Sequence, residues 1–152
     1  MTEQAQLQAS QSKIKKAVSI AVAVVAAIIA GLIAKTVVRG VMTPGPADRA
    51  AMINRGLMEG AAQQRRLLPQ KLDDATTFTE IHVDGTTAEY RYLIGAGYEL
   101  QNFAAFERGV RAKVCASSMK SAVESGASFV YTYSAAPPSN RQLLSFRISS
   151  CP

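Results

Sequence analysis

The feature that most constrains this chain is an uninterrupted apolar stretch near its N-terminus. Residues 17–34 contain no charged side chain, and Ser19 is the one polar residue among them. Extended to Val38, the stretch is long enough to cross a bilayer, whose hydrocarbon core takes about 20 apolar residues in an α-helix. The sequence therefore predicts a transmembrane helix with basic flanks over residues 13–39.

The orientation of this helix depends on its flanks. Lysine and arginine lie on both sides, so the positive-inside rule is close to a tie, but the compact Lys13–Lys16 cluster favours a cytoplasmic N-terminus. A cleavable signal peptide is the rival interpretation, with an apolar region of about 7–15 residues followed by a small-x-small site. Bulky Leu32 stands where a small residue is needed, which favours an uncleaved anchor.

The predicted organisation is that of a single-pass protein of the bacterial inner membrane. Its parts are a cytoplasmic tail (1–12), the transmembrane helix (13–39), a linker (40–46) and a periplasmic domain (47–152). Small residues recur at every fourth position of the membrane segment, at Ser19, Ala23, Ala27 and Gly31. Such rows let helices approach closely, which predicts packing against a second copy or another membrane subunit.

The formal charge of +6 is concentrated around the membrane segment. Residues 1–39 carry five basic side chains and one acidic one, giving +4, whereas residues 40–152 carry twelve basic and ten acidic side chains, giving +2. Basic residues beside an apolar helix contact lipid head groups, so the lipid bilayer is a predicted partner. The nearly balanced domain argues against a nucleic-acid partner.

Cys115 and Cys151 are the only cysteines. A bond between them would close a loop of roughly 37 residues and stabilise the fold by about 3–4 kcal/mol. Disulfides persist outside the cytosol, so a bonded pair would indicate a periplasmic or extracellular domain, whereas two unpaired buried thiols are the alternative. Two cysteines and one distant histidine supply too few ligands for a metal site, and no cofactor is predicted.

The pattern of the domain predicts three helices and two strand hairpins. Apolar residues at steps of three and four predict a helix from Ala47 to Leu68, and Asn102 is a favourable N-cap for another. Asp84-Gly85 is a hairpin turn signal between two alternating segments. The predicted fold class is α+β: a mostly antiparallel four-stranded sheet, made of the two hairpins and covered on one face by helices.

Four tyrosines form the clearest candidate binding site. Tyr90 and Tyr92 lie in the first hairpin, and Tyr131 and Tyr133 lie in the second. Tyrosine is enriched at interfaces, so these pairs are candidates for an aromatic surface that binds a peptide or glycan. The alternative is the core of the sheet, because aromatic residues have high β-propensity.

His82, the only histidine, is the centre of a second candidate site. Glu80 and Asp84 lie on the same face of its strand, a row suited either to acid–base chemistry or to cation binding. A solvated polar face is the alternative. No catalytic or nucleotide-binding motif occurs in the sequence, so no catalytic residue is assigned and the protein is not predicted to be an enzyme.

Two further charged positions have structural expectations. Glu107 projects close to the apolar arc of its predicted helix, where an unpaired carboxylate would be costly, so an ion pair with an arginine or a tilt toward solvent is expected. Arg65 and Arg66 lie near the end of the first predicted helix and are expected to complement its dipole rather than bind an anion.

Several segments of the chain resemble a group of small bacterial envelope proteins. The resemblance is carried by LPQKLDDATTFTEIHVDGTTAEYRY, by Cys115, by GASFVYTYS and by Cys151, and it covers residues 67–151. Those proteins have one N-terminal apolar segment and an outer α+β domain. The resemblance implies an envelope location and a Cys115–Cys151 bond, and it implies no catalytic residues.

The sequence favours a non-enzymatic protein that binds another envelope protein, as an accessory subunit of an envelope machine or an immunity-type inhibitor. The contact surface is expected on whichever sheet face or edge the helices leave open, including Tyr92 and Tyr131. A periplasmic small-molecule or glycan-binding module is the alternative, and it predicts an enclosed pocket lined by the tyrosines. An enzyme built around His82 would require a concave site.

Overall fold

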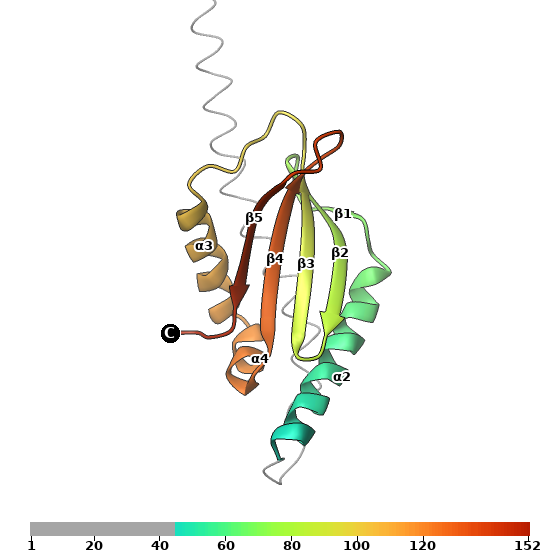
Figure 1. The fold of residues 1–152 in the computed structure, drawn as a ribbon, viewed down its shortest axis with the longest axis vertical. Helices are drawn as coiled ribbons and strands as arrows, with labels where there is room; N and C mark the ends of the chain where they lie inside the picture. The colour runs from blue at the N-terminus through green and yellow to red at the C-terminus, as the bar shows by residue number, and fades with distance from the viewer. Residues whose placement is uncertain (1–44) are drawn as a thin grey trace, which may run out of the picture.

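A five-stranded sheet forms the centre of residues 45–152, the part of the chain that the computed structural model describes. Helix α2 lies on the β2 side of the sheet, α3 lies on the β5 side, and α4 lies near the lower ends of the strands (Figure 1). The elements in chain order are α2 (Pro46–Arg65), β1 (Gln70–Lys71), β2 (Thr76–Asp84), β3 (Thr87–Ile94), α3 (Phe103–Cys115), α4 (Met119–Ser125), β4 (Ser128–Ala135) and β5 (Gln142–Ile148).

The predicted transmembrane helix over residues 13–39 lies outside the described residues. The same holds for the tail and for the packing row of Ser19, Ala23, Ala27 and Gly31. Within residues 45–152, no helix combines the length and the apolar character needed to span a membrane.

The sheet is mixed, which corrects the prediction of a mostly antiparallel four-stranded sheet. The two predicted hairpins are present, because β2 pairs antiparallel with β3 and β4 pairs antiparallel with β5. The two hairpins meet through β3 and β4, however, and these strands are parallel. Helices α3 and α4 form a crossover that returns the chain to the end of the sheet where β3 begins, so β4 runs in the same direction as β3.

A fifth strand, β1, was not predicted. It pairs antiparallel with the start of β2, with Gln70 opposite Phe78 and Lys71 opposite Thr77. A strand of two residues cannot display the two-residue alternation by which strands are recognised in a sequence.

The helix ends follow local chemistry. Pro46 occupies the start of α2, where its missing N–H costs nothing. The side-chain oxygen of Asn102 accepts a hydrogen bond from the backbone N–H of Ala105 at 3.0 Å, so Asn102 is the N-cap of α3, as predicted. Gly126 ends α4 with a φ of 111°, a conformation that glycine adopts without steric cost.

A β-bulge in β2 decides which side chains face the helices. Strict alternation would place Phe78 on the same face as Glu80, but the pairing with β3 shifts register between these two residues. The extra residue lets both Phe78 and Ile81 point into the core, where they are 1% and 3% exposed.

Candidate functional site

The four tyrosines predicted as binding residues are buried in the core instead. Tyr90, Tyr92, Tyr131 and Tyr133 are between 0% and 4% exposed. The parallel register places Tyr90 opposite Tyr131 and Tyr92 opposite Tyr133, and their ring centroids lie 5.3 Å and 4.8 Å apart. Phe106 of α3 packs edge-to-face on Tyr133 at 5.0 Å. Of the two interpretations of these tyrosines, the core of the sheet is the one that the structure shows, and they form no exposed aromatic surface.

The environment of these tyrosines is apolar. The hydroxyl oxygens of Tyr90 and Tyr92 are buried and have no hydrogen-bond partner among the described residues. Burial raises the pKa of all four phenols above their ordinary value, because it disfavours the charged form. These side chains therefore contribute to the core rather than to a surface that a partner could reach.

A hollow of about 470 Å³ lies at the end of the sheet, away from these rings. The loop after β3 meets the loop between β4 and β5 there, and its lining includes Tyr98, Leu100, Phe103, Arg141 and Leu143. None of the four core tyrosines lines it. The hollow is thus not the tyrosine-lined pocket that the sequence predicted for a ligand-binding module.

The opposite face of the sheet carries polar and charged side chains, and we call it the polar face. Its exposed members are Glu80, His82, Arg91, Ser145 and Arg147, and its half-buried members are Glu89 and Thr132. They come from four adjacent strands, β2 to β5, in positions that alternate with the core residues. The polar face is therefore the side of the sheet opposite the core, and it extends across β2 to β5.

Arg91 organises the polar face. Its Nε and Nη2 atoms each donate to one carboxylate oxygen of Glu89 at 3.0 Å, and its Nη1 atom donates to Glu80 at 3.2 Å. The hydroxyl of Thr132 donates to Glu89 at 3.0 Å and lies 3.1 Å from the hydroxyl of Ser145. One network thus connects all four strands and fixes the positions of its donors and acceptors.

The same contacts hold Glu89 and Arg91 in their charged forms. The hydrogen bond from Arg91 lowers the pKa of Glu89, and Thr132 adds to this effect while partial burial opposes it. The hydrogen bond to Glu89 raises the pKa of Arg91. The contacts between Glu89 and Arg91 therefore favour the ion pair at the centre of the polar face.

His82 lies exposed on the polar face, opposite Glu89 in the register of β2 and β3. The neighbouring carboxylate of Glu80 is already bound to Arg91. Neither His82, Glu80 nor Asp84 lines the hollow, so the Glu–His–Asp row predicted from the sequence is not joined in that concavity. Within residues 45–152, no group of three or more histidine, cysteine, aspartate or glutamate side chains is arranged to hold a metal ion.

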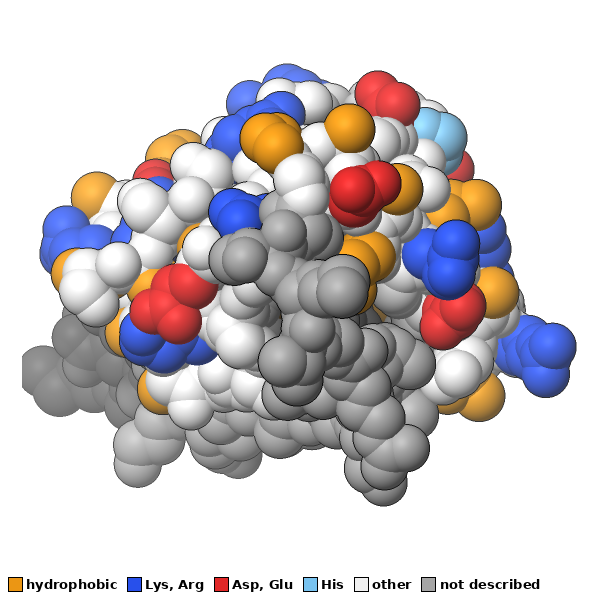
Figure 2. Space-filling view, turned by 90° about the horizontal axis from the view of Figure 1, so that it is seen from below, with side chains coloured by type: hydrophobic (Ala, Val, Ile, Leu, Met, Phe, Trp, Pro, Cys, Tyr) orange, Lys and Arg blue, Asp and Glu red, His pale blue; other side chains and the backbone are white. Residues whose placement is uncertain are grey.

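The surface carries mixed charge. Basic and acidic side chains are interspersed over the visible part of the domain seen from below, without a large patch of one sign (Figure 2).

Glu107 pairs with Arg111 at 3.0 Å, one helical turn away, as expected for a carboxylate near an apolar arc.

Arg65 does more than complement a helix dipole. It lies in the last turn of α2, and its Nε atom donates to the backbone oxygen of Ile81 in β2 at 3.1 Å. Arg66 caps the helix with its backbone and is exposed. Arg65 therefore also fastens α2 to the sheet.

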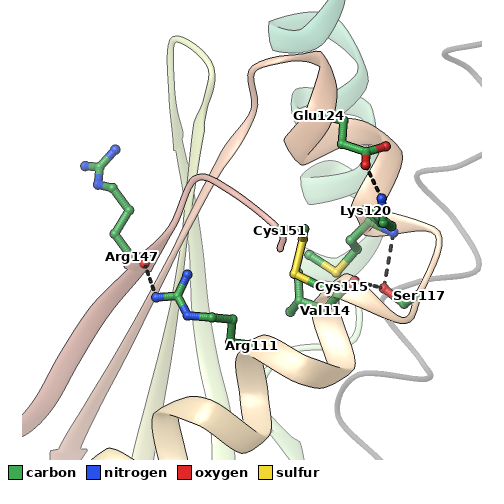
Figure 3. The surroundings of a disulfide bond; sticks show 9 residues. Arg111, Val114, Cys115, Ser117, Lys120, Glu124, Arg147 and Cys151 are labelled. Carbon is green, nitrogen blue, oxygen red and sulfur yellow. Dashed lines mark hydrogen bonds and ion pairs between the residues drawn. A yellow bond between two sulfur atoms is a disulfide. The ribbon is translucent and has the colours of Figure 1, made fainter.

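Cys115 and Cys151 form a disulfide, with their Cα atoms 5.5 Å apart. The bond joins the last residue of α3 to the chain beyond β5, beside the Lys120–Glu124 ion pair of α4 (Figure 3). This confirms the pairing that the resemblance implied. Such a bond persists in oxidising compartments.

Comparisons with known proteins identify the fold but no family. No family model matches the chain, and no curated protein matches its sequence. Two type II secretion-system pilotins are similar in structure: one from Vibrio vulnificus (8% identity, TM-score 0.59) and one from Vibrio cholerae (11% identity, TM-score 0.57). Each comparison covers 68% of this chain and 94% of the other.

A third solved structure of the same fold is described as a secreted protein of Pseudomonas aeruginosa. It is 14% identical, with a TM-score of 0.59, and the match covers 68% of this chain and 95% of the other. These similarities correct the predicted localisation as a single-pass inner-membrane protein: the neighbours are described as secreted or as secretion-system pilotins, and no described helix could span a membrane.

Proposed function

We propose that this protein is a non-enzymatic accessory protein of the cell envelope that binds another protein through the polar face of its sheet. The observation that carries the proposal is the network of Arg91, Glu89, Glu80 and Thr132. A binding face needs donors and acceptors that hold their geometry before the partner arrives, because ordering side chains on binding costs free energy.

The fold supports an accessory role in protein secretion. Two of its structural neighbours are pilotins of type II secretion systems, and the third is described as a secreted protein. The Cys115–Cys151 disulfide supports a location in an oxidising part of the envelope. An immunity-type inhibitor would use the same protein-binding surface and stays a prediction from the sequence.

Site-specific crosslinking in intact cells tests the proposal. A photoreactive residue placed at His82 or Ser145 of the full chain samples the polar face, whereas one placed at Glu59 samples the exposed side of α2. We expect protein adducts from the two polar-face positions and few from Glu59. An Arg91→Glu substitution in the same background should remove those adducts, because it reverses the charge at the centre of the network.

A matched control tests whether a charge reversal elsewhere on the surface also removes the adducts. Arg55 is exposed on α2, and Arg55→Glu makes the same charge change away from the polar face. The adducts should survive this change. Equal labelling from all three crosslinking positions, or adducts that persist in the Arg91→Glu protein, would count against the polar face as the binding surface.

A second candidate function is the binding of a small molecule or glycan, and the hollow favours it. Its volume of about 470 Å³ is within the range of ligand pockets, and Tyr98 and Phe103 offer aromatic surface beside Arg141. Thermal-shift measurements with envelope glycans, on the wild type and on Phe103→Ala, test this function. Stabilisation of the wild type alone would support it.

A further inference from the structure

The two edges of the sheet are covered to different extents. An edge strand presents outward N–H and C=O groups that can pair with a strand of another molecule. In this sheet β1 and β2 form one edge and β5 forms the other. What covers each edge decides whether the domain can add a strand there.

The β2 edge is covered at three separate places. Strand β1 pairs with Thr77 and Phe78 at the start of β2. Further along, Arg65 donates to the oxygen of Ile81, and at the hairpin the Nδ2 atom of Asn54 donates to the oxygen of Gly85 at 2.7 Å. Several separate contacts would have to break before another strand could pair here.

The β5 edge lies beside α3, and one side-chain hydrogen bond from that helix caps its second half. The Nη2 atom of Arg111 donates to the backbone oxygen of Arg147 at 3.1 Å (Figure 3). Glu107 accepts a hydrogen bond from the same Nη2 atom at 3.0 Å. Outward groups recur at every second residue of an edge strand, so the backbone of Ser145 points the same way as that of Arg147. Among the described residues, Arg111 is the side chain that hydrogen-bonds to a backbone oxygen of β5.

We propose that Arg111 is an edge-blocking residue that keeps β5 from pairing with β5 of a second copy of this chain. The guanidinium of Arg111 is bonded to the backbone oxygen of Arg147, and an N–H of an incoming strand would need that oxygen as its acceptor. A paired edge would also enclose its charge away from water, which is costly. The proposal is independent of the function assigned to the polar face.

A second copy is the partner that this edge fits. Two β5 strands related by a two-fold axis would run antiparallel and present identical patterns to each other. Buried Phe146 and Ile148 alternate with exposed Ser145 and Arg147 along the strand. Pairing in register would therefore continue both the core face and the polar face from one copy into the next.

The test is the self-association of full-length variants, measured by sedimentation in one buffer over a series of concentrations. We expect Arg111→Ala to self-associate about tenfold or more tightly than the wild type. Arg65→Ala should behave as the wild type, because β1 and α2 still cover the β2 edge. Arg108→Ala is the matched control, since Arg108 is exposed on the same helix as Arg111.

A second variant distinguishes strand pairing from aggregation of a damaged fold. Arg111→Ala combined with Ser145→Pro lacks an outward N–H on the β5 edge, and proline is tolerated on edge strands. This double variant should return to the association level of the wild type, with an unchanged circular dichroism spectrum. Association of Arg111→Ala equal to that of Arg108→Ala, or association that persists in the double variant, would overturn the proposal.

Discussion

Arg91 holds both carboxylate oxygens of Glu89, two residues away on the same strand, through two hydrogen bonds of 3.0 Å. Side chains at this spacing share a face of the strand, so the pair forms without any change in the backbone. Its contribution to stability can be measured directly.

The first prediction concerns Glu89→Gln. Removing the carboxylate charge should lower the free energy of unfolding by about 1 kcal/mol at neutral pH, which is typical of a charged hydrogen bond that is partly solvated. The pKa of Glu89 is lower in the folded protein than its ordinary value of 4.5, so its stabilisation is complete above pH 4.5 and is lost as the pH falls through the folded value.

Urea denaturation at several pH values checks this prediction. The difference in the free energy of unfolding between the wild type and Glu89→Gln should become smaller as the pH falls below 4.5. Glu59→Gln is the control, because Glu59 is exposed and has no ion pair among the described residues. A difference that stays constant down to acid unfolding would contradict the role of the ion pair.

The second prediction is alkaline instability. Burial raises the pKa of Tyr90, Tyr92, Tyr131 and Tyr133 above the ordinary value of 10.0. The folded protein therefore keeps the four phenols neutral. Their contribution to the free energy of unfolding is complete below pH 10.0 and is lost as the pH rises above it, because the unfolded chain releases these protons first. In an ultraviolet titration, these four tyrosines should ionise only together with unfolding. Independent, reversible ionisation of the four in the folded protein would show that their rings are accessible.

The third prediction concerns the disulfide. Cys115 and Cys151 are 36 positions apart, and opening a loop of this size should cost about 3–4 kcal/mol of unfolding free energy. Denaturation with and without reductant measures this loss, and the Cys115→Ser/Cys151→Ser protein should match the reduced wild type. A loss of unfolding free energy below about 1 kcal/mol would mean that packing alone already holds α3 and the C-terminal segment together.

The fourth prediction concerns a buried hydroxyl. The hydroxyl of Tyr92 has no hydrogen-bond partner among the described residues, so Tyr92→Phe should leave stability within about 0.5 kcal/mol or raise it slightly. Asn102→Ala provides the contrast, because it removes a bonded helix cap and should cost about 1 kcal/mol. Thermal denaturation compares the two, and an equal loss in both would contradict the prediction.

Local signals in the sequence determined most of the secondary structure. Asn102 caps α3, Gly126 ends α4, and Asp84-Gly85 turns the first hairpin, because each depends on chemistry within a few residues. Two cysteines allow only one intramolecular pair, but the sequence alone left open whether they bond, and the structure shows that they do. The sequence did not predict the bulge in β2 or the two-residue strand β1, because no local residue pattern marks either of them.

Only the tertiary structure decided how these elements combine and where a partner could bind. The crossover through α3 and α4 makes β3 and β4 parallel, and this register stacks Tyr90 on Tyr131 and Tyr92 on Tyr133 beneath the helices. Alternation along one strand says that two faces differ, but it does not say which face the helices will cover. That choice depends on long-range packing, which buried the tyrosines and left the Arg91 network on the surface.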